Sequence, residues 1–276
     1  MAELRRLLSG PNGWRHTWHE SPLSFGLAAL DFHLPEGGLA CGALHEIVPA
    51  TQAALPAASG FLVAILARRS SPSPAVSGKS GVGGAAHFSP PLQRSRKPVL
   101  FIVPAYGRSR CGYLPGRISG HGLNSLGLDP SRAILVETAH RKETLWALVE
   151  ALRSGAPRAV VGAIDRLDLK TSQKLHLAAA DASRPLLLLR PSQTLESSAA
   201  ATRWRVGTAP AARDRFGLYA RPRWRLQLER CRNGRPGEWV VEYDHVTHRF
   251  SLVAALADHS LSCGGGAQSD KQAARS

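Results

Sequence analysis

Cysteines, acidic residues and long apolar runs are all scarce in this chain of 276 residues. The 4 cysteines lie far apart and form no CxxC pair, which argues against a zinc site of the usual spacing and against a disulfide framework. We therefore expect free thiols in a reducing cytoplasm. No apolar run approaches the ~18 residues of a membrane span. The first ten residues also lack the apolar segment of a secretory signal, so no membrane association is predicted.

The shortage of acidic side chains leaves a large positive charge. The chain has 35 basic and 20 acidic residues, a formal net charge of +15, and 29 of the basic residues are arginine. Arginine binds phosphate oxygens in a bidentate manner, which favours a nucleic-acid partner. A GC-rich genome is the ordinary alternative, since it raises Arg, Ala, Gly and Pro together. Codon bias does not explain the low number of Asp and Glu residues. We therefore keep binding to the DNA backbone as a hypothesis.

Three segments are expected to lie outside the folded core. We interpret residues 1–20 as an N-terminal leader, residues 70–96 as a disordered insert rich in Ser, Pro and Gly, and residues 259–276 as a disordered tail. Because strand-like sequence resumes directly after residue 97, the insert is expected within one domain, spanning residues 21–258.

Short apolar segments alternate with helical patterns through the first two thirds of the chain. Continuous apolar strands, without polar alternation, are typical of a parallel sheet covered by helices on both faces. The sequence therefore predicts an α/β fold. The expected strands are 42–48, 98–103, 133–137, 159–165 and 185–190, and the expected helices are 57–69, 141–154 and 171–182.

The pattern changes to strict alternation in residues 202–254, which predicts antiparallel C-terminal strands. Trp224, Leu226 and Leu228 should face the core, and the arginines between them should face outward. Asn233-Gly234 predicts a two-residue hairpin turn. The outward arginines are our candidate surface for DNA or a protein partner, with a solvated face as the alternative: Arg203, Arg205, Arg223, Arg225, Arg230, Arg232 and Arg235. Tryptophans that face the core are not expected to stack on bases.

Residues 21–47 carry the most specific pattern: Phe25-Gly26, Ala29-Leu30-Asp31, residues 34–39 (Leu-Pro-Glu-Gly-Gly-Leu) and residues 42–47 (Gly-Ala-Leu-His-Glu-Ile). This order resembles the entry to RecA-like domains. The last motif, with the C-terminal Thr-Arg-Trp-Arg-Val and Pro-Arg-Trp-Arg-Leu segments, resembles the inducible-mutagenesis accessory protein A family (ImuA), which is also described as SulA-like.

The resemblance implies a cytoplasmic, bacterial accessory factor of damage-induced, error-prone translesion DNA synthesis. It also implies three partners: an inactive relative of the Y-family polymerases, an error-prone replicative-type polymerase and the RecA recombinase. By the same resemblance, the core should be RecA-like. Two alternatives stay open, an active RecA-like DNA-dependent ATPase and a SulA-like inhibitor of cell division.

A RecA-like ATPase needs a glycine-rich phosphate loop with a lysine directly after its first strand. Residues 49–60 contain one glycine and no lysine, so we predict a degenerate loop, no cofactor and no enzymatic activity. Gly78-Lys79-Ser80 lacks the preceding glycine and strand. Asp165 ends an apolar strand where a magnesium-positioning carboxylate would lie, but we interpret it as an ordinary strand-end residue. We likewise expect no metal ligands among the histidine pairs and no catalytic role for His45 or Glu46.

Overall fold

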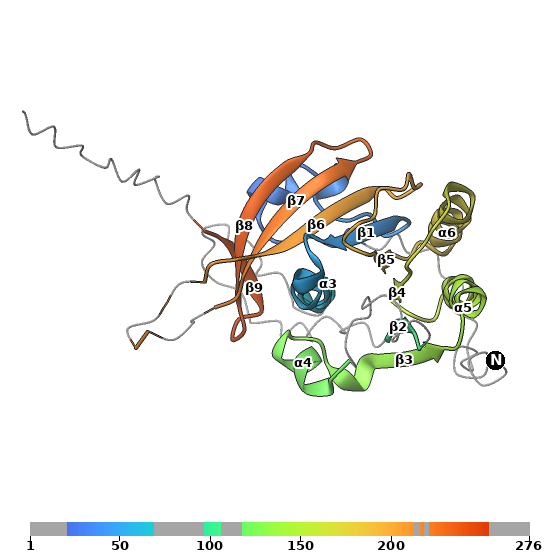
Figure 1. Ribbon diagram of the computed structural model, residues 1–276, viewed down its shortest axis with the longest axis horizontal. Helices are drawn as coiled ribbons and strands as arrows, with labels where there is room; N and C mark the ends of the chain where they lie inside the picture. Colours follow the sequence, from blue (N-terminus) through green and yellow to red (C-terminus); the bar gives the residue numbers. More distant parts are fainter. Residues whose placement is uncertain are drawn as a thin grey trace, which may run out of the picture.

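A computed structural model describes residues 21–68, 97–105, 118–211, 213, 216–217 and 221–253. In this part of the chain a single sheet of nine strands has the order β3-β2-β4-β5-β1-β6-β7-β8-β9. The sheet curves around helix α3 (Leu55–Arg68), while α5 (Arg141–Ser154) and α6 (Leu169–Ala182) lie on its outer side (Figure 1). The strands therefore form a layer between two layers of helix.

Six neighbouring strands of the sheet are parallel. The strands β1, β4 and β5 are buried at every position, which explains why their sequences are almost continuously apolar. At one edge, β3 pairs only with β2 and is half exposed. The bounds of these strands are β1 Leu44–Pro49, β2 Val99–Pro104, β3 Ala133–Thr138, β4 Ala159–Ala163, β5 Leu186–Leu189 and β6 Thr202–Ala209.

The remaining strands, β7 (Arg223–Cys231), β8 (Gly237–Asp244) and β9 (Arg249–Leu252), extend the sheet in antiparallel fashion from β6. The predicted hairpin between β7 and β8 is confirmed, but the two-residue turn is wrong. Leu228 pairs with Gly237, so the connection is longer than Asn233-Gly234. The last residues of β7, Arg230 and Cys231, pair with β6 and not with β8.

Two apolar clusters hold the layers together. The inner cluster packs α3 against β6–β9 and is rich in aromatic rings; Phe61 on α3 lies 6.2 Å from Trp204 and 6.0 Å from Trp224, measured between ring centroids. The outer cluster packs Leu148 and Leu152 of α5 and Leu175 of α6 against the other face of the parallel strands. Burial of apolar area on both faces is the main stabilising contribution in such a layered fold.

Helix ends follow local sequence signals. Asp168 caps α6 by accepting a hydrogen bond from the Thr171 amide, and Gly155 ends α5 in the left-handed conformation that favours glycine. The shorter helical elements are α2 Ala28–Asp31, α4 Gly120–Ser125 and the 3₁₀ turns η1 Pro35–Gly37, η2 Gln52–Ala54 and η3 Pro130–Arg132.

The predicted fold class is confirmed: an α/β, RecA-like core with a mainly parallel sheet and antiparallel C-terminal strands. The helix predicted over 141–154 has these bounds, whereas the one expected from 171 begins earlier, at Leu169. The leader 1–20, the insert 70–96 and the tail 259–276 lie outside the described residues. No helix in the described residues combines the length and apolar character needed to cross a membrane.

Two glycines provide a test of this packing. A Cβ at Gly60, inside α3, would meet Trp224 at 3.5 Å, whereas a Cβ at Gly162, in β4, would meet Leu148 at 2.8 Å. We therefore expect Gly60→Ala to raise the free energy of unfolding by about 0.5–1 kcal/mol, because alanine favours helix. Gly162→Ala should lower it by about 1–3 kcal/mol through overpacking. Urea unfolding measures both, and a stabilised Gly162→Ala protein would contradict the described packing of α5 on β4.

Candidate functional site

The segment between β1 and α3 occupies the place of a phosphate loop. In such a loop, free glycine amides and a lysine at the helix start surround the phosphates. Here the helix start is formed by Ala54 and Leu55, both almost fully buried. The Ala50 amide donates a hydrogen bond to the Val206 carbonyl at 2.7 Å, and the Ala54 amide donates to Thr51. The segment thus presents an apolar helix start and uses two of its amides inside the fold.

Asp165 follows β4 at the same carboxyl edge of the sheet. Its carboxylate Oδ1 accepts a hydrogen bond from the Arg166 amide at 2.8 Å, so it begins the turn that leads to α6. This local bond agrees with the interpretation of Asp165 as a strand-end residue. In the described part of the chain, no three His, Cys, Asp or Glu side chains gather closely enough to hold a metal ion.

The most unusual feature of this edge is a buried carboxylate. Glu46, in the middle of β1, is fully buried, and its Oε2 accepts hydrogen bonds from the Arg203 guanidinium at 2.8 Å. The Nε of Arg190, also fully buried, lies 3.5 Å from Glu46 Oε1. Two guanidiniums thus face one buried carboxylate, as expected where a buried charge is tolerated only when it is paired.

Arg190 and Arg203 also fix the chain that leaves β5. Arg190 donates to the Ile164 carbonyl at 3.1 Å and to the Glu196 carboxylate at 2.5 Å. Arg203 donates to the main-chain carbonyl of Glu196 at 2.6 Å. The connection from β5 to β6 is therefore held against the carboxyl ends of β4 and β1.

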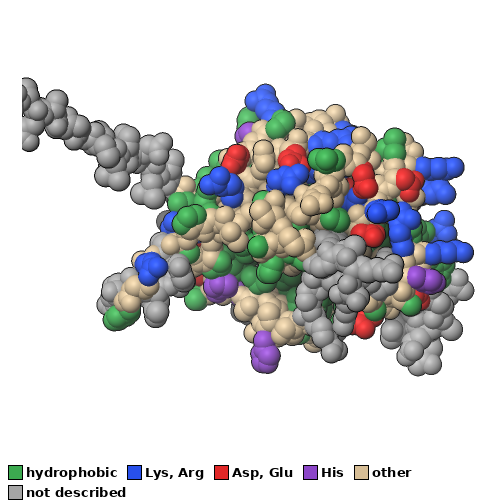
Figure 2. All heavy atoms as spheres, viewed as in Figure 1, with side chains coloured by type: hydrophobic (Ala, Val, Ile, Leu, Met, Phe, Trp, Pro, Cys, Tyr) green, Lys and Arg blue, Asp and Glu red, His purple; other side chains and the backbone are tan. Residues whose placement is uncertain are grey.

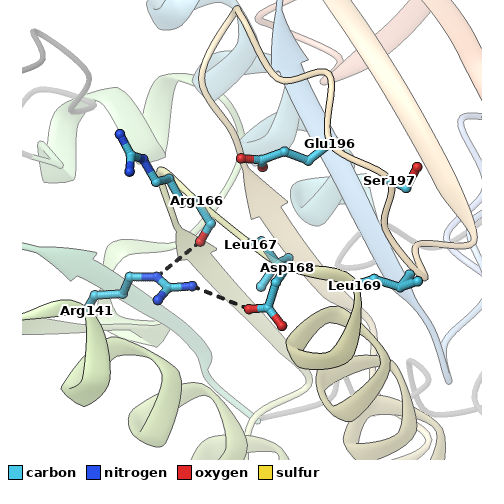
Figure 3. A pocket seen from close by; sticks show the side chains of 7 residues that line it. All are labelled: Arg141, Arg166, Leu167, Asp168, Leu169, Glu196 and Ser197. Carbon is cyan, nitrogen blue, oxygen red and sulfur yellow. Dashed lines mark hydrogen bonds and ion pairs between the residues drawn. The ribbon is translucent and has the colours of Figure 1, made fainter.

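This connection forms one wall of a pocket of about 780 Å³ between the first turns of α5 and α6 (Figure 3). Arg141 lines the pocket, with Nε donating to the Arg166 carbonyl at 3.2 Å and Nη2 lying 3.7 Å from the Asp168 carboxylate. The side chain of Arg166 points away from Asp168 (Figure 3). The pocket is lined by Arg141, Arg166, Leu167, Asp168, Leu169, Glu196 and Ser197.

The acidic groups of this pocket are poor candidates for general acids. Hydrogen bonds from Thr171 hold the pKa of Asp168 below its usual range. The Glu196 carboxylate is already bound by Arg190. General acid catalysis near neutral pH requires a raised carboxyl pKa, so this arrangement is suited to binding charged groups more than to proton transfer.

His45 and the described cysteines also have structural surroundings. His45 is buried between the Ala40 carbonyl and the Thr202 hydroxyl, each 2.9 Å from a ring nitrogen, and burial lowers its pKa to about 4. Burial, with the nearby Glu36 charge, raises the pKa of the Cys41 thiol to about 11. Burial likewise raises the pKa of Cys231. A neutral imidazole and protonated thiols fit a packing role.

The predicted arginines divide into two groups. We name Arg203, Arg205, Arg223 and Arg225 the strand-face arginines; they point away from the buried Trp204 and Trp224, as expected. Each of them is paired with a carboxylate: Glu46, Glu229, Glu242 and Glu238, respectively. Basic and acidic side chains are accordingly interspersed over the upper part of the molecule in Figure 2.

Arg230, Arg232 and Arg235, which we name the hairpin arginines, differ in their partners. Arg230 donates to the Ser198 carbonyl at 2.6 Å and Arg232 to the Ala199 carbonyl at 3.3 Å. The Arg235 guanidinium lies 5.8 Å from the centre of the Phe32 ring. Within the described residues these three cations contact no carboxylate, so their charge is available to an anion.

Comparison with known proteins assigns the chain to a family. It is 32% identical, over 259 residues, to the protein ImuA of Caulobacter vibrioides strain NA1000 / CB15N, covering 87% of this chain and 91% of the relative. ImuA of C. vibrioides strain ATCC 19089 / CIP 103742 / CB 15 matches equally. The chain belongs to the ImuA family.

No protein-family model matches the chain. ImuA-family membership, shared along most of both chains, confirms the resemblance found in the motifs and supports an accessory role in damage-induced mutagenesis.

The arginines were recognisable in the sequence, but their partners were not. The pocket around Arg141 joins residues from three separate segments, which no local pattern links. The one available signal for Glu46 was its position, next to His45, inside a mainly apolar strand. In a buried parallel strand, a charged residue requires a partner of opposite charge from a neighbouring element.

Removal of the Glu46 charge tests the buried ion group. We expect Glu46→Gln to lower the free energy of unfolding by roughly 3–5 kcal/mol, because two buried guanidiniums lose their shared carboxylate. Glu238→Gln is the matched control: its 3.9 Å pair with Arg225 is exposed, so the change should stay below about 1 kcal/mol. Urea unfolding followed by circular dichroism gives both values. Equal midpoints for the two variants would show that the group adds nothing to stability.

Proposed function

We propose that this ImuA-family chain is a non-catalytic accessory protein of damage-induced, error-prone translesion DNA synthesis. In this role it recruits or bridges polymerase partners at damaged DNA. The partners that the family resemblance implies are an inactive Y-family-like polymerase subunit, an error-prone replicative-type polymerase and the RecA recombinase. The proposal rests on family membership together with the altered phosphate-loop position.

The observation that carries the non-catalytic part of the proposal is the helix start at Ala54 and Leu55. A triphosphate needs several free amides and a cation at this point, because three or four negative charges must be neutralised. Leu55 is 5% exposed and belongs to the inner core, and the next residue, Pro56, has no amide hydrogen to donate. These features favour a RecA-like fold that serves as a binding scaffold.

Contact with DNA is the second part of the proposal, through the arginines of the C-terminal strands. The strand-face arginines would have to exchange a carboxylate for a phosphate, which reduces the gain from binding. The hairpin arginines would keep their carbonyl contacts and add an anion. We therefore expect Arg230, Arg232 and Arg235 to contribute more to DNA affinity than the strand-face arginines.

The absence of nucleotide chemistry can be tested directly. We expect no ATP hydrolysis and no ATP binding in the micromolar range, because the phosphate-loop position lacks a lysine and presents apolar side chains. Isothermal titration with Mg²⁺-ATP measures binding, with Asp165→Ala and the matched surface variant Asp181→Ala run in parallel. Saturable, magnesium-dependent binding that Asp165→Ala abolishes and Asp181→Ala preserves would establish a nucleotide site and contradict this part of the proposal.

Recruitment can be tested by affinity capture of the tagged full-length chain from DNA-damaged bacterial cells. We expect both polymerase partners to be captured, and to remain after nuclease treatment, because the proposal requires protein–protein contact. Untreated cells and the tag alone are the controls. Capture that disappears with nuclease would mean that DNA alone tethers the proteins. Capture of the division GTPase without any polymerase would favour the SulA-like alternative.

A further inference from the structure

Phe32 is a large apolar side chain that the fold leaves in solvent. It ends the short helix α2, and 75% of its surface is exposed. The helix itself is firmly placed, since the Asp31 carboxylate accepts hydrogen bonds from the amides of Phe25 and Leu27 at 2.8 and 3.1 Å. Because Phe25 is fully buried beside Trp204, helix α2 and the Phe32 that follows it are anchored to the core.

The hairpin between β7 and β8 packs against His33, the residue that follows Phe32. The Arg235 amide donates to the His33 carbonyl at 3.0 Å, and His33 Nδ1 lies 3.1 Å from the Pro236 carbonyl. The approach is close enough to require glycine: a Cβ on Gly234 would lie 2.4 Å from the His33 carbonyl. Phe32 and Arg235 are therefore held together before any ligand binds, and Arg230 and Arg232 belong to the same hairpin.

The charge around the ring is mainly positive. Arg235 lies against Phe32, and Arg230 and Arg232 are exposed at the same end of the hairpin. Arg232 also lies 3.5 Å from His176, and burial together with the Arg232 charge lowers the pKa of that imidazole. The acidic residues nearest to Phe32 in the sequence are Asp31, which is engaged by α2, and the exposed Glu36. The two acidic residues of the hairpin, Glu229 and Glu238, pair with Arg205 and Arg225. An exposed aromatic ring among arginines is thus available to a ligand with both a flat face and negative charge.

We propose that Phe32 and the hairpin arginines Arg230, Arg232 and Arg235 form a contact site for single-stranded DNA. An unpaired base stacks on Phe32, and the arginines bind the neighbouring phosphates. Stacking on an aromatic side chain with cations nearby is the general way in which proteins hold single strands without reading sequence. A duplex is a poorer ligand, since its base faces are covered by neighbouring bases. The inference deepens the proposed function and rests on it only for the presence of DNA where the protein acts.

The stacking part is tested by fluorescence anisotropy with a labelled oligothymidine and the full-length chain. We expect Phe32→Ala to weaken single-strand binding roughly five- to hundredfold, with an unchanged slope of log affinity against log salt. Phe216→Ala, which removes another ring that is 70% exposed, is the matched control and should change affinity less than twofold. Phe32→Leu keeps an apolar side chain and should lose binding similarly, which covers the case of a poorly folded alanine variant.

The phosphate part is tested by the salt dependence of the same binding. Arg232→Gln and Arg235→Gln should each flatten the slope by ~0.7. Lys142→Gln, which removes an exposed cation of α5 outside the proposed DNA surface, should leave it unchanged. Wild-type affinity in Phe32→Leu, or no binding of the oligonucleotide by the wild-type chain, would overturn the inference. Neither result bears on ATP binding or on nuclease-resistant capture of polymerases, which test the proposed function separately.

Discussion

Burial of the Glu46 carboxylate constrains the centre of this fold. A charge in the middle of a buried strand costs several kcal/mol unless cations approach it closely, and Arg190 and Arg203 do so from the end of β5 and from β6. The same two guanidiniums hold Glu196, and with it the connection between these strands. One ion group therefore joins β1 to its two neighbours at the point where the parallel sheet leads into the antiparallel strands.

Several arginines of the C-terminal strands are likewise used in ion pairs within the sheet. Arg203 is needed inside the protein, and the other strand-face arginines pair with carboxylates of β7 and β8. The large positive charge of the sequence is thus partly used for cohesion of the sheet. Among the predicted arginines in the described residues, those that contact no carboxylate lie at the β7–β8 hairpin, where Arg235 is beside Phe32.

Much of the fold was predictable because its signals are local. Continuous apolar strands predicted the parallel sheet, and alternation predicted that Trp224 would face the core. The ion pairs were not predictable in this way, since Glu46 and Arg203 lie 157 positions apart and meet only through strand order. Exposure of Phe32 was missed for a related reason. A large apolar side chain is expected to be buried, and its place at the surface is set by the packing of the distant β7–β8 hairpin against His33.

We propose a RecA-like scaffold that binds other macromolecules and does not hydrolyse nucleotide. The helix start at Leu55 is apolar and carries no phosphate-binding lysine. Asp165 still lies where a magnesium-positioning carboxylate would be needed for nucleotide chemistry, so it is the residue to change. The most direct test is the frequency of damage-induced mutation in cells whose own copy of the gene is deleted. Complementation with the Asp165→Ala chain should restore the wild-type frequency at equal protein level. A frequency as low as that of the deletion strain, with the variant folded and expressed, would contradict the account.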